Sequence, residues 1–292
     1  MNCFITGGLG FVGRSLSNFL LGKGHRVTAV GLSQNPDLIE HPDFRYISAD
    51  TTREGAWQQA LAGQEVIVNL AGKSIFKRWT DKNKQEIYDS RILTTRNLVG
   101  ALPGNAQTVF CSTSAVGYYG LRGDEELTEE DGPGTDFLAR LAADWEGEAQ
   151  KATEKDARVI ITRFGLVLGK TGGVLGQMIP LFKKFIGGPL GNGNQWFSWI
   201  HMDDLLSAFL FVFNNKTISG PVNFCAPNPV RNRDLAKALG EVLKRPSFVP
   251  TPAFVLRLIL GEFGSVVLEG QRVTPSRLLR YGFAFKYPEI RK

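Results

Sequence analysis

Short β-branched segments alternate with amphipathic helical segments through the first two thirds of this chain of 292 residues. The strand-like segments are almost continuously apolar, which is typical of a parallel sheet covered by helices on both faces. In the helical segments, apolar residues recur at i, i+3 and i+4. The pattern predicts a doubly wound α/β fold, which binds ligands at the carboxyl ends of its strands. The expected strands are residues 2–6, 26–30, 44–48, 65–70, 108–112 and 158–164, and the expected helices are residues 11–21, 52–61, 82–98, 136–152, 233–243 and 253–260.

The composition changes after Leu168, where eight glycines fall within residues 169–193. Such a segment is too rich in glycine for a regular core element, so we expect a second, smaller module to begin there. Residues 199–213 are again strongly apolar and are expected to return to the main sheet. The expected first domain is residues 1–168 and 199–222, and the expected small C-terminal α/β substrate module is residues 169–198 and 223–292.

Positive charge is concentrated at the C-terminal end of the chain. Residues 215–292 hold 13 Lys and Arg against 5 Asp and Glu, whereas the whole chain holds 34 against 28. These cations are scattered singly without interleaved aromatic residues, so we expect a solvated surface or one that favours an anionic ligand, and no nucleic-acid partner. No apolar run approaches the ~18 residues that a membrane span requires, so no membrane partner is expected.

Cysteine usage and the start of the chain indicate the compartment. Cys3, Cys111 and Cys225 lie in apolar segments and form no metal-ligand spacing, so we expect buried free thiols and no metal site. The first residues contain no cationic segment typical of a signal peptide. A reducing cytoplasm is therefore the expected location.

A glycine triplet carries the strongest local signal for chemistry. Gly7, Gly10 and Gly13 follow the first apolar strand and open an amphipathic helix. In this context the glycines permit a tight turn, a close approach of backbone to a diphosphate, and packing of the helix on its strand. A plain strand–turn–helix could carry the same triplet. We favour dinucleotide binding, with the N–H groups of Phe11 and Val12 facing the diphosphate.

The end of the second expected strand bears on which dinucleotide binds. An NAD site usually places Asp or Glu there, but Val30–Asn35 contains no carboxylate. Ser33 could donate a hydrogen bond to a 2′-phosphate, and Arg14 and Arg26 are available cations. These residues favour NADP(H) over NAD(H), although Arg14 could equally be a solvated surface residue.

Several further motifs, found in order along nearly the whole chain, carry a family resemblance. With them the chain resembles the extended short-chain dehydrogenase/reductase superfamily, and within it the atypical branch of epimerase family proteins, which have a Rossmann fold and a small C-terminal domain. The motifs are Thr6–Gly13, Asn69–Gly72, Arg78–Thr80, Ser90–Arg91, Ser112–Gly120, Trp145–Glu146, Gly187–Gly193, Trp199–Asp204, Asn223–Pro229 and Leu268–Val273.

The resemblance implies a role for several polar residues at expected strand ends. Ser114 matches the catalytic Ser or Thr of the superfamily, and Asp50 would bind the adenine amino group. Asp50 could instead cap the helix that follows it. The remaining residues expected to line the cofactor are Asn69, Leu70, Ala71, Gly72, Ser112 and Thr113.

The catalytic pattern of that superfamily is incomplete in this chain. It needs a Tyr with a Lys four residues later, whose ammonium stabilises the tyrosinate. The expected helix over residues 136–146 contains neither residue. Tyr118, which has Arg122 four residues later, and Tyr119 lie after the fifth strand and are the remaining candidates for a proton donor. The alternative is that both phenols only wall a pocket.

Three residues near the expected module boundary are candidates for substrate contacts. Gln195 and Trp196 could stack on a planar ligand or form a hinge between the modules. His201 could act as a general base, although a lone His without an identified partner favours structural use. Asp203 or Asp204 is expected to cap the helix that follows. The acidic segment 124–131 is expected to be a solvated turn.

Two functions are consistent with these residues. The first is an NADP(H)-dependent oxidoreductase or epimerase that acts on a small oxygenated substrate. The second is a non-catalytic protein that binds NADPH as a sensor or scaffold, which the missing Tyr and Lys pair favours. A homodimer is possible, and the sequence does not identify the substrate.

Overall fold

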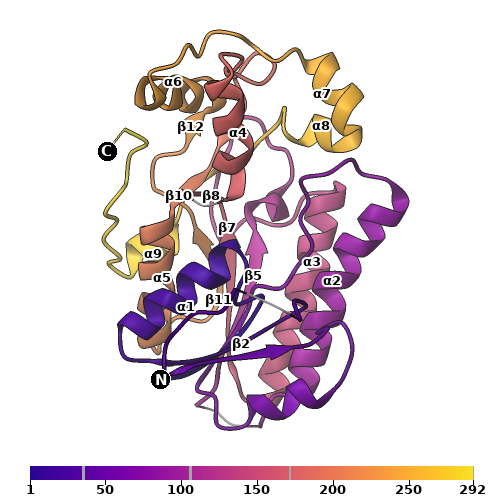
Figure 1. Cartoon of the computed structure of the whole chain (residues 1–292), viewed down its shortest axis with the longest axis vertical. Coiled ribbons are helices and arrows are strands. Elements are labelled where there is room, and N and C mark those ends of the chain that lie inside the picture. The colour runs from indigo at the N-terminus through magenta and orange to yellow at the C-terminus, as the bar shows by residue number, and fades with distance from the viewer. Residues whose placement is uncertain (35–36, 105–106, 171, 292) are drawn as a thin grey trace.

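The computed structural model describes residues 1–34, 37–104, 107–170 and 172–291. Its centre is a parallel sheet of seven strands in the order β11-β7-β5-β4-β1-β2-β3, which confirms the doubly wound α/β fold (Figure 1). The order reverses beside β1, where such folds bind their ligands. The strands are β1 (Asn2–Thr6), β2 (Arg26–Gly31), β3 (Phe44–Ser48), β4 (Val66–Asn69), β5 (Val109–Ala115), β7 (Arg158–Phe164) and β11 (Gly220–Phe224).

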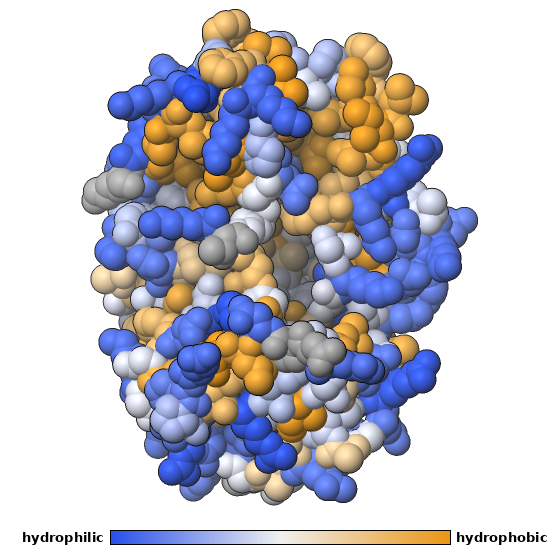
Figure 2. All heavy atoms as spheres, in the orientation of Figure 1, coloured by the Kyte–Doolittle hydropathy of each residue, from blue (hydrophilic) through white to orange (hydrophobic). Residues whose placement is uncertain are grey.

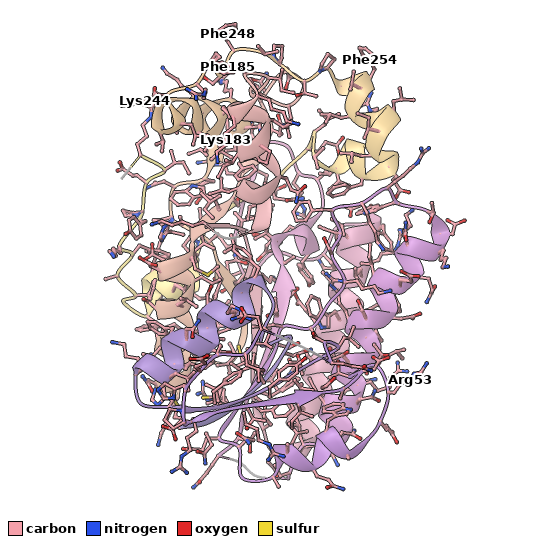
Figure 3. All side chains as sticks on the ribbon, viewed as in Figure 1. Arg53, Lys183, Phe185, Lys244, Phe248 and Phe254 are labelled. Atoms are coloured by element: carbon pink, nitrogen blue, oxygen red, sulfur yellow. The ribbon has the colours of Figure 1, made fainter. Side chains whose placement is uncertain are left out.

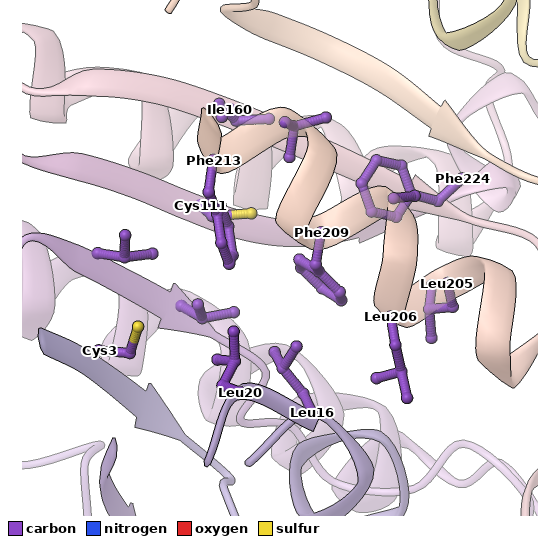
Figure 4. Close-up of a cluster of buried hydrophobic side chains, with 14 of the residues drawn as sticks. Cys3, Leu16, Leu20, Cys111, Ile160, Leu205, Leu206, Phe209, Phe213 and Phe224 are labelled. Carbon is purple, nitrogen blue, oxygen red and sulfur yellow. The ribbon is translucent and has the colours of Figure 1, made fainter. Parts of the chain in front are cut away.

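Helices cover both faces of this sheet. On one face, α1 (Phe11–Gly22) and α5 (Met202–Asn214) bury Leu16, Leu20 and Phe209 in a cluster with β1 and β5 (Figure 4). On the other face lie α2 (Asp81–Gly100) and α3 (Phe137–Gln150). The cysteines are free and buried, as expected. Burial raises the pKa of Cys3 and Cys111 to about 12, so these thiols are protonated and unreactive at neutral pH.

Outside the main sheet, β8 (Leu166–Gly169) pairs in parallel with β10 (Trp199–His201). The structure places α5 against the main sheet and β11 on its edge. None of the helices in the described ranges is long and apolar enough to span a bilayer. The other elements after β7 are α4 (Gly173–Lys183), β9 (Trp196–Phe197), β12 (Val230–Arg231), α6 (Asn232–Leu243), α7 (Ala253–Leu260), α8 (Glu262–Val266), β13 (Arg272–Val273) and α9 (Ser276–Arg280).

The expectation that the glycine-rich segment holds no regular core element is wrong. Helix α4 lies inside it and buries Phe182. The glycines before α4 permit close packing, because a Cβ at Gly169, Gly172 or Gly173 would lie within 3 Å of the Phe11 ring. The glycines therefore bring the small module against the first residue of α1.

The helix expected over residues 52–61 is also shorter than predicted. Residues 56–61 form a 3-10 helix, η1 (Ala56–Leu61), which starts after Gly55. The turn before it is closed by Asp50, whose Oδ1 accepts hydrogen bonds from the backbone N and the Oγ1 of Thr52 at 3.0 and 2.6 Å. Competition of this kind between a short polar side chain and the helix is common near helix starts.

The acidic segment 124–131 is solvated only in part: Asp124, Glu126 and Glu130 are exposed, as expected, but the basic C-terminal part packs on the segment. Strand β6 (Glu126–Leu127) pairs in parallel with β13. Glu129 is buried and accepts hydrogen bonds from the backbone N–H groups of Asn223 and Arg277. These contacts account for part of the excess positive charge after residue 215. The ion pairs across this contact join Asp124 to Arg231 at 2.7 Å, Glu126 to Arg272 at 3.0 Å and Glu130 to Arg280 at 3.8 Å.

We expect Glu129→Gln to remove a pH-dependent part of the stability. Burial raises the pKa of the Glu129 carboxyl above its usual value of 4.5, so folding favours the protonated form. That stabilisation is fully present below the unfolded pKa and is lost as the pH rises through the higher folded pKa. The free energy of unfolding of the wild type, minus that of Glu129→Gln, should therefore fall as the pH rises above 4.5.

Urea unfolding at a series of pH values measures this difference. Glu130→Gln is the matched control, because Glu130 lies in the same segment and forms only a 3.8 Å ion pair at the surface. A difference that rises with pH would contradict the assignment, since it would mean that the folded state favours the ionised carboxylate of Glu129.

Candidate functional site

The glycine loop places the N-terminus of α1 at the carboxyl ends of β1 and β4. Gly7 has a φ of +66°, and its N–H donates to the carbonyl of Val30 at 2.8 Å. A Cβ at Gly13 would lie 2.1 Å from the Gly7 oxygen, so only glycine lets α1 pack this closely on the loop. Gly10 is the N-cap and has no side chain to satisfy the N–H groups of the first turn. The loop therefore presents free donors and positive potential to an anion.

A buried hydrogen-bond network holds the neighbouring strand ends in place. The Asn69 side chain accepts from Thr6 Oγ1 and donates to Thr95 Oγ1, both at 2.8 Å. Thr6 Oγ1 in turn accepts from the backbone N–H groups of Leu70 and Ala71 at 3.1 and 3.2 Å. The Asn69 amide thus lies under the site and positions the backbone of residues 70–72, which borders the glycine loop.

The residues expected around the adenosine end lie in different surroundings. Ser33 and Asp50 are exposed after β2 and β3. Arg14 forms an ion pair with Asp37 at 3.5 Å, so a carboxylate lies just beyond the stretch that lacks one. Arg26 is the first residue of β2 and so lies at the amino end of this strand, away from the carboxyl ends where ligands bind. It pairs with Asp43 at 3.4 Å. Arg26 is therefore not available to a cofactor.

Arg91 is a cation at this site to which the sequence reasoning gave no role of its own. Its guanidinium lies between Gly72, where a Cβ would be 3.0 Å away, and the Trp145 ring, whose centroid is 5.3 Å away. It donates to the carbonyls of Ile87 and Lys73 at 3.0 and 3.1 Å. No carboxylate pairs with it in the described part of the chain, and burial lowers its pKa to about 10. An anion from a ligand would offset this unpaired charge.

Ser114 begins a second network of buried polar groups at the end of β5. Its Oγ donates to Glu146 Oε1 at 2.6 Å, and Arg163 from β7 binds the Glu146 carboxylate through two nitrogens at 2.8 and 2.9 Å. Ser114 is 1% exposed, and Arg163 is 3% exposed. In this arrangement the Ser114 hydroxyl is engaged inside the protein. Ser112 is equally buried, and the half-buried Thr113 has an Oγ1 with no hydrogen-bond partner among the described residues.

The two tyrosines after β5 differ in accessibility. Tyr119 is fully buried, and its hydroxyl donates to Asn223 at 2.7 Å and accepts from Arg163 at 2.9 Å. Burial raises its pKa well above the usual value, which makes it a poor source of protons. Tyr118 is half-buried, and its ring lies on the Arg163 guanidinium, whose carbon is 3.5 Å from the ring centroid.

The cation beside Tyr118 is therefore Arg163 rather than Arg122. Gly120, with a φ of +64°, ends the short helix η2 (Val116–Tyr119), so the spacing of four residues does not place Tyr118 and Arg122 on one helical face. Arg122 instead donates to the carbonyl of Gly132 at 3.2 Å. Because Tyr118 lies in η2 and Arg163 in β7, spacing in the sequence could not reveal this pair.

Each candidate for substrate contact has partners within the protein. Gln195 donates to the carbonyls of Leu190 and Val267 at 3.2 and 3.1 Å, although its buried Oε1 has no partner among the described residues. Trp196 donates to Asp124 at 2.8 Å, and the Arg231 guanidinium stacks on its ring at 3.7 Å.

His201 is itself the N-cap of α5, because its Nδ1 accepts from the backbone N–H of Asp203 at 3.1 Å. The prediction that Asp203 or Asp204 caps this helix is therefore wrong. The Asp204 carboxylate instead accepts from the backbone N–H groups of Lys286 and Tyr287 at 2.8 and 2.9 Å. These bonds tie the C-terminal segment to α5.

The features of the candidate site are a helix end with free N–H donors, an unpaired, half-buried cation and a half-buried phenol over a guanidinium. Figure 2 shows the surface hollowed near its centre, at the level where α1 begins. The described ranges hold no cluster of three His, Cys, Asp or Glu suited to a metal ion. A helix end of this kind can hold a diphosphate, and a phenol over a guanidinium can transfer a proton.

Known proteins with this architecture share its sequence features. Residues 3–224 match the model of the NAD dependent epimerase/dehydratase family, and residues 251–292 match a domain of unknown function, DUF1731. The chain is 42% identical to the chloroplastic epimerase family protein SDR39U1 homolog of Arabidopsis thaliana, over all of this chain and 85% of that protein. It is 37% identical to the epimerase family protein YfhF of Bacillus subtilis, over 99% of this chain and 95% of that one.

Solved structures agree with this assignment. The human epimerase family protein SDR39U1, determined with NADPH, has a TM-score of 0.86 and 31% identity, over 100% of this chain and 97% of that one. A UDP-glucuronic acid 4-epimerase from Bacillus cereus has a TM-score of 0.80 at 17% identity, over 98% of this chain and 95% of that one, which shows the fold alone. The chain belongs to the NAD dependent epimerase/dehydratase family, with the C-terminal domain found in its epimerase family protein relatives.

Proposed function

We propose that this chain binds NADP(H) at the N-terminus of α1 and acts as an oxidoreductase or epimerase on a small oxygenated substrate. The observation that carries the proposal is the first turn of α1, whose N-cap is Gly10 and whose donors face the carboxyl ends of β1 and β4. The human relative solved with NADPH supports the same cofactor class. On the adenosine side, Ser33 and Arg14 would contact the 2′-phosphate and Asp50 the adenine.

The other contacts follow from the positions of the strand ends. Backbone groups of Leu70, Ala71 and Gly72 would line the cofactor, with Asn69 holding them in place. Ser112 and Thr113 would border it from β5. When bound, the reduced nicotinamide supplies a hydride equivalent to the substrate.

Tyr118 is the residue we assign to proton transfer. Tyr119 is buried and hydrogen-bonded on both sides of its hydroxyl, whereas Tyr118 is half-buried at the end of β5. The Arg163 guanidinium beneath the Tyr118 ring would stabilise negative charge that develops there as the proton leaves. This pair would replace the missing Tyr and Lys combination.

Tyr118→Phe is expected to lower kcat by about a hundredfold, the usual contribution of a positioned general acid. NADPH consumption with a panel of small carbonyl substrates measures this effect. Tyr119→Phe is the matched control and should change the unfolding temperature more than kcat, because it removes a buried hydrogen bond to Asn223. Unchanged turnover in Tyr118→Phe would remove this residue from the mechanism.

A non-catalytic NADPH-binding sensor or scaffold is the second candidate. The engagement of the Ser114 hydroxyl with Glu146 favours it, because that hydroxyl is not free to meet a substrate in this arrangement. This function predicts tight NADPH binding, no turnover with any substrate class, and a protein surface that differs between the NADPH and NADP+ complexes. A homodimer and a cytoplasmic location stay predictions from the sequence.

A further inference from the structure

The small module carries a concentrated group of exposed apolar side chains. Figure 2 shows them as an apolar area at the end of the molecule formed by α4, α6 and α7. Phe248 is 79% exposed, and Phe254 is 70% exposed, far more than packing in a core would leave. Nine of the large apolar residues that are exposed in the described ranges belong to this area: Leu181, Phe185, Ile186, Val242, Phe248, Val249, Phe254, Leu258 and Ile259.

These nine residues fall in two segments, residues 181–186 and 242–259. The two segments contain five Lys and Arg and no Asp or Glu, so all their charged residues are basic. None of the five forms an ion pair with another described residue, in contrast to the paired cations that face the acidic segment 124–131. We call residues 181–186 and 242–259 the apolar–basic patch. Its cations are Lys183, Lys184, Lys244, Arg245 and Arg257.

The two segments contact each other at this end of the molecule. The Arg245 guanidinium lies 4.7 Å from the centre of the Phe185 ring, and the backbone N–H of Thr251 donates to the Pro189 carbonyl at 2.8 Å. Figure 3 labels Phe185, Phe248, Lys183 and Lys244 near one another at this end, and Phe254 on α7 at the other side of the same end. Basic and aromatic side chains therefore lie together at this end of the molecule.

Two residues of the patch occupy a backbone conformation that usually selects glycine. Phe185 and Lys244, which follow α4 and α6, have φ of +63° and +52°. Phe185 closes α4 as the C′ residue, with its N–H donating to the Phe182 carbonyl and the next N–H to the Leu181 carbonyl. A Phe in this position costs folding free energy and leaves its ring 56% exposed. Strain of this kind in an exposed aromatic residue indicates that the residue has a role other than stabilising the folded protein.

We propose that the apolar–basic patch docks on the surface of an anionic lipid bilayer. Aromatic rings and aliphatic side chains flanked by Lys and Arg match the interface, where rings enter the headgroup layer and cations meet lipid phosphates. A second copy of this chain fits less well, since a two-fold contact would bring two sets of unpaired cations together without acidic partners. The expectation of no membrane partner rested on the lack of a spanning segment, which does not bear on docking at the surface.

Vesicle sedimentation with the full-length chain tests this proposal. We expect binding to vesicles of phosphatidylcholine with phosphatidylglycerol, weakening with added salt, and little binding to phosphatidylcholine alone. Phe248→Ser with Phe254→Ser, and separately Lys183→Ser with Lys244→Ser, should each lower the partition coefficient about tenfold or more. Leu32→Ser and Arg53→Ser are matched controls from the other domain, and both should bind like the wild type; Leu32 is 68% exposed, and Figure 3 labels Arg53 far from the patch.

Phe185→Gly separates a docking role from a structural one. Glycine relieves the left-handed conformation, so the unfolding temperature should rise while vesicle binding falls. A variant that loses both stability and binding would assign Phe185 to packing and overturn its part in docking. Equal binding to neutral and anionic vesicles, or no binding to either, would overturn the proposal. So would a dimer in sedimentation velocity that the Phe248→Ser and Phe254→Ser variant dissociates.

Discussion

Gly13→Ala is expected to weaken NADPH binding by about a hundredfold or more, equivalent to at least ~2.8 kcal/mol. A Cβ at this position would lie 2.1 Å from the Gly7 oxygen and 2.8 Å from the Gly8 Cα, both of them backbone atoms. Helix α1 must then move away from the glycine loop, and its first-turn N–H groups lose their alignment with a diphosphate. Isothermal titration calorimetry of NADPH binding measures the loss.

Gly22→Ala is the matched control for this variant. Gly22 ends the same helix, and a Cβ there would meet nothing within 4 Å. It should bind NADPH like the wild type and unfold at the same or a slightly higher temperature, because Ala favours helix over Gly. Normal NADPH affinity in Gly13→Ala, with its fold intact by circular dichroism, would show that the close packing of α1 on the loop does not shape the cofactor site.

Glu146→Ala is expected to lower the free energy of unfolding by about 3–5 kcal/mol, the usual cost of leaving a buried charge unpaired. Arg163 would lose both hydrogen bonds to the carboxylate, and Ser114 would lose its 2.6 Å acceptor. Adding Arg163→Met to Glu146→Ala should recover part of that loss, because the double variant buries no unpaired charge. Urea unfolding of the wild type, Glu146→Ala, Arg163→Met and the double variant measures the coupling between the two residues.

The surface ion pair between Glu241 and Arg291 provides the comparison. Both side chains are about half exposed and 3.4 Å apart, so Glu241→Ala should cost less than about 1 kcal/mol. If Glu146→Ala proved as mild as Glu241→Ala, the Arg163 guanidinium would have to be solvated in the variant. The polar groups at the end of β5 would then be accessible to water rather than held in fixed positions under Tyr118.

The sheet and its helices were predictable because a strand that is buried on both faces is an apolar run, which is visible in the local sequence. Six of the seven central strands were expected within a few residues of their observed bounds, since most of them are short, almost continuous apolar runs. Helix α4 was not expected, because the reason for its glycines lies outside the segment. They accommodate the Phe11 ring, which is far away in the sequence.

The candidate site was predictable where it depends on local backbone and not where it depends on distant partners. The glycine loop and the strand ends at Asn69 and Ser114 lie where the pattern predicted. Tyr118 contacts Arg163 from β7, and Ser114 donates to Glu146 from α3, so no spacing in the sequence reveals these pairs. The ion pairs of the acidic segment 124–131 were not predicted for the same reason, since its partners lie more than a hundred residues later.

Calorimetry of NADPH binding to the wild type and Gly10→Asp tests most directly whether the diphosphate lies at the N-terminus of α1. Asp is a favoured N-cap, so the variant should fold at least as stably, while its carboxylate occupies the position of the anion. Tight binding by the wild type and a loss of about a hundredfold or more in Gly10→Asp is the predicted result. Equal affinity in the two proteins, or no measurable affinity in the wild type, would contradict it.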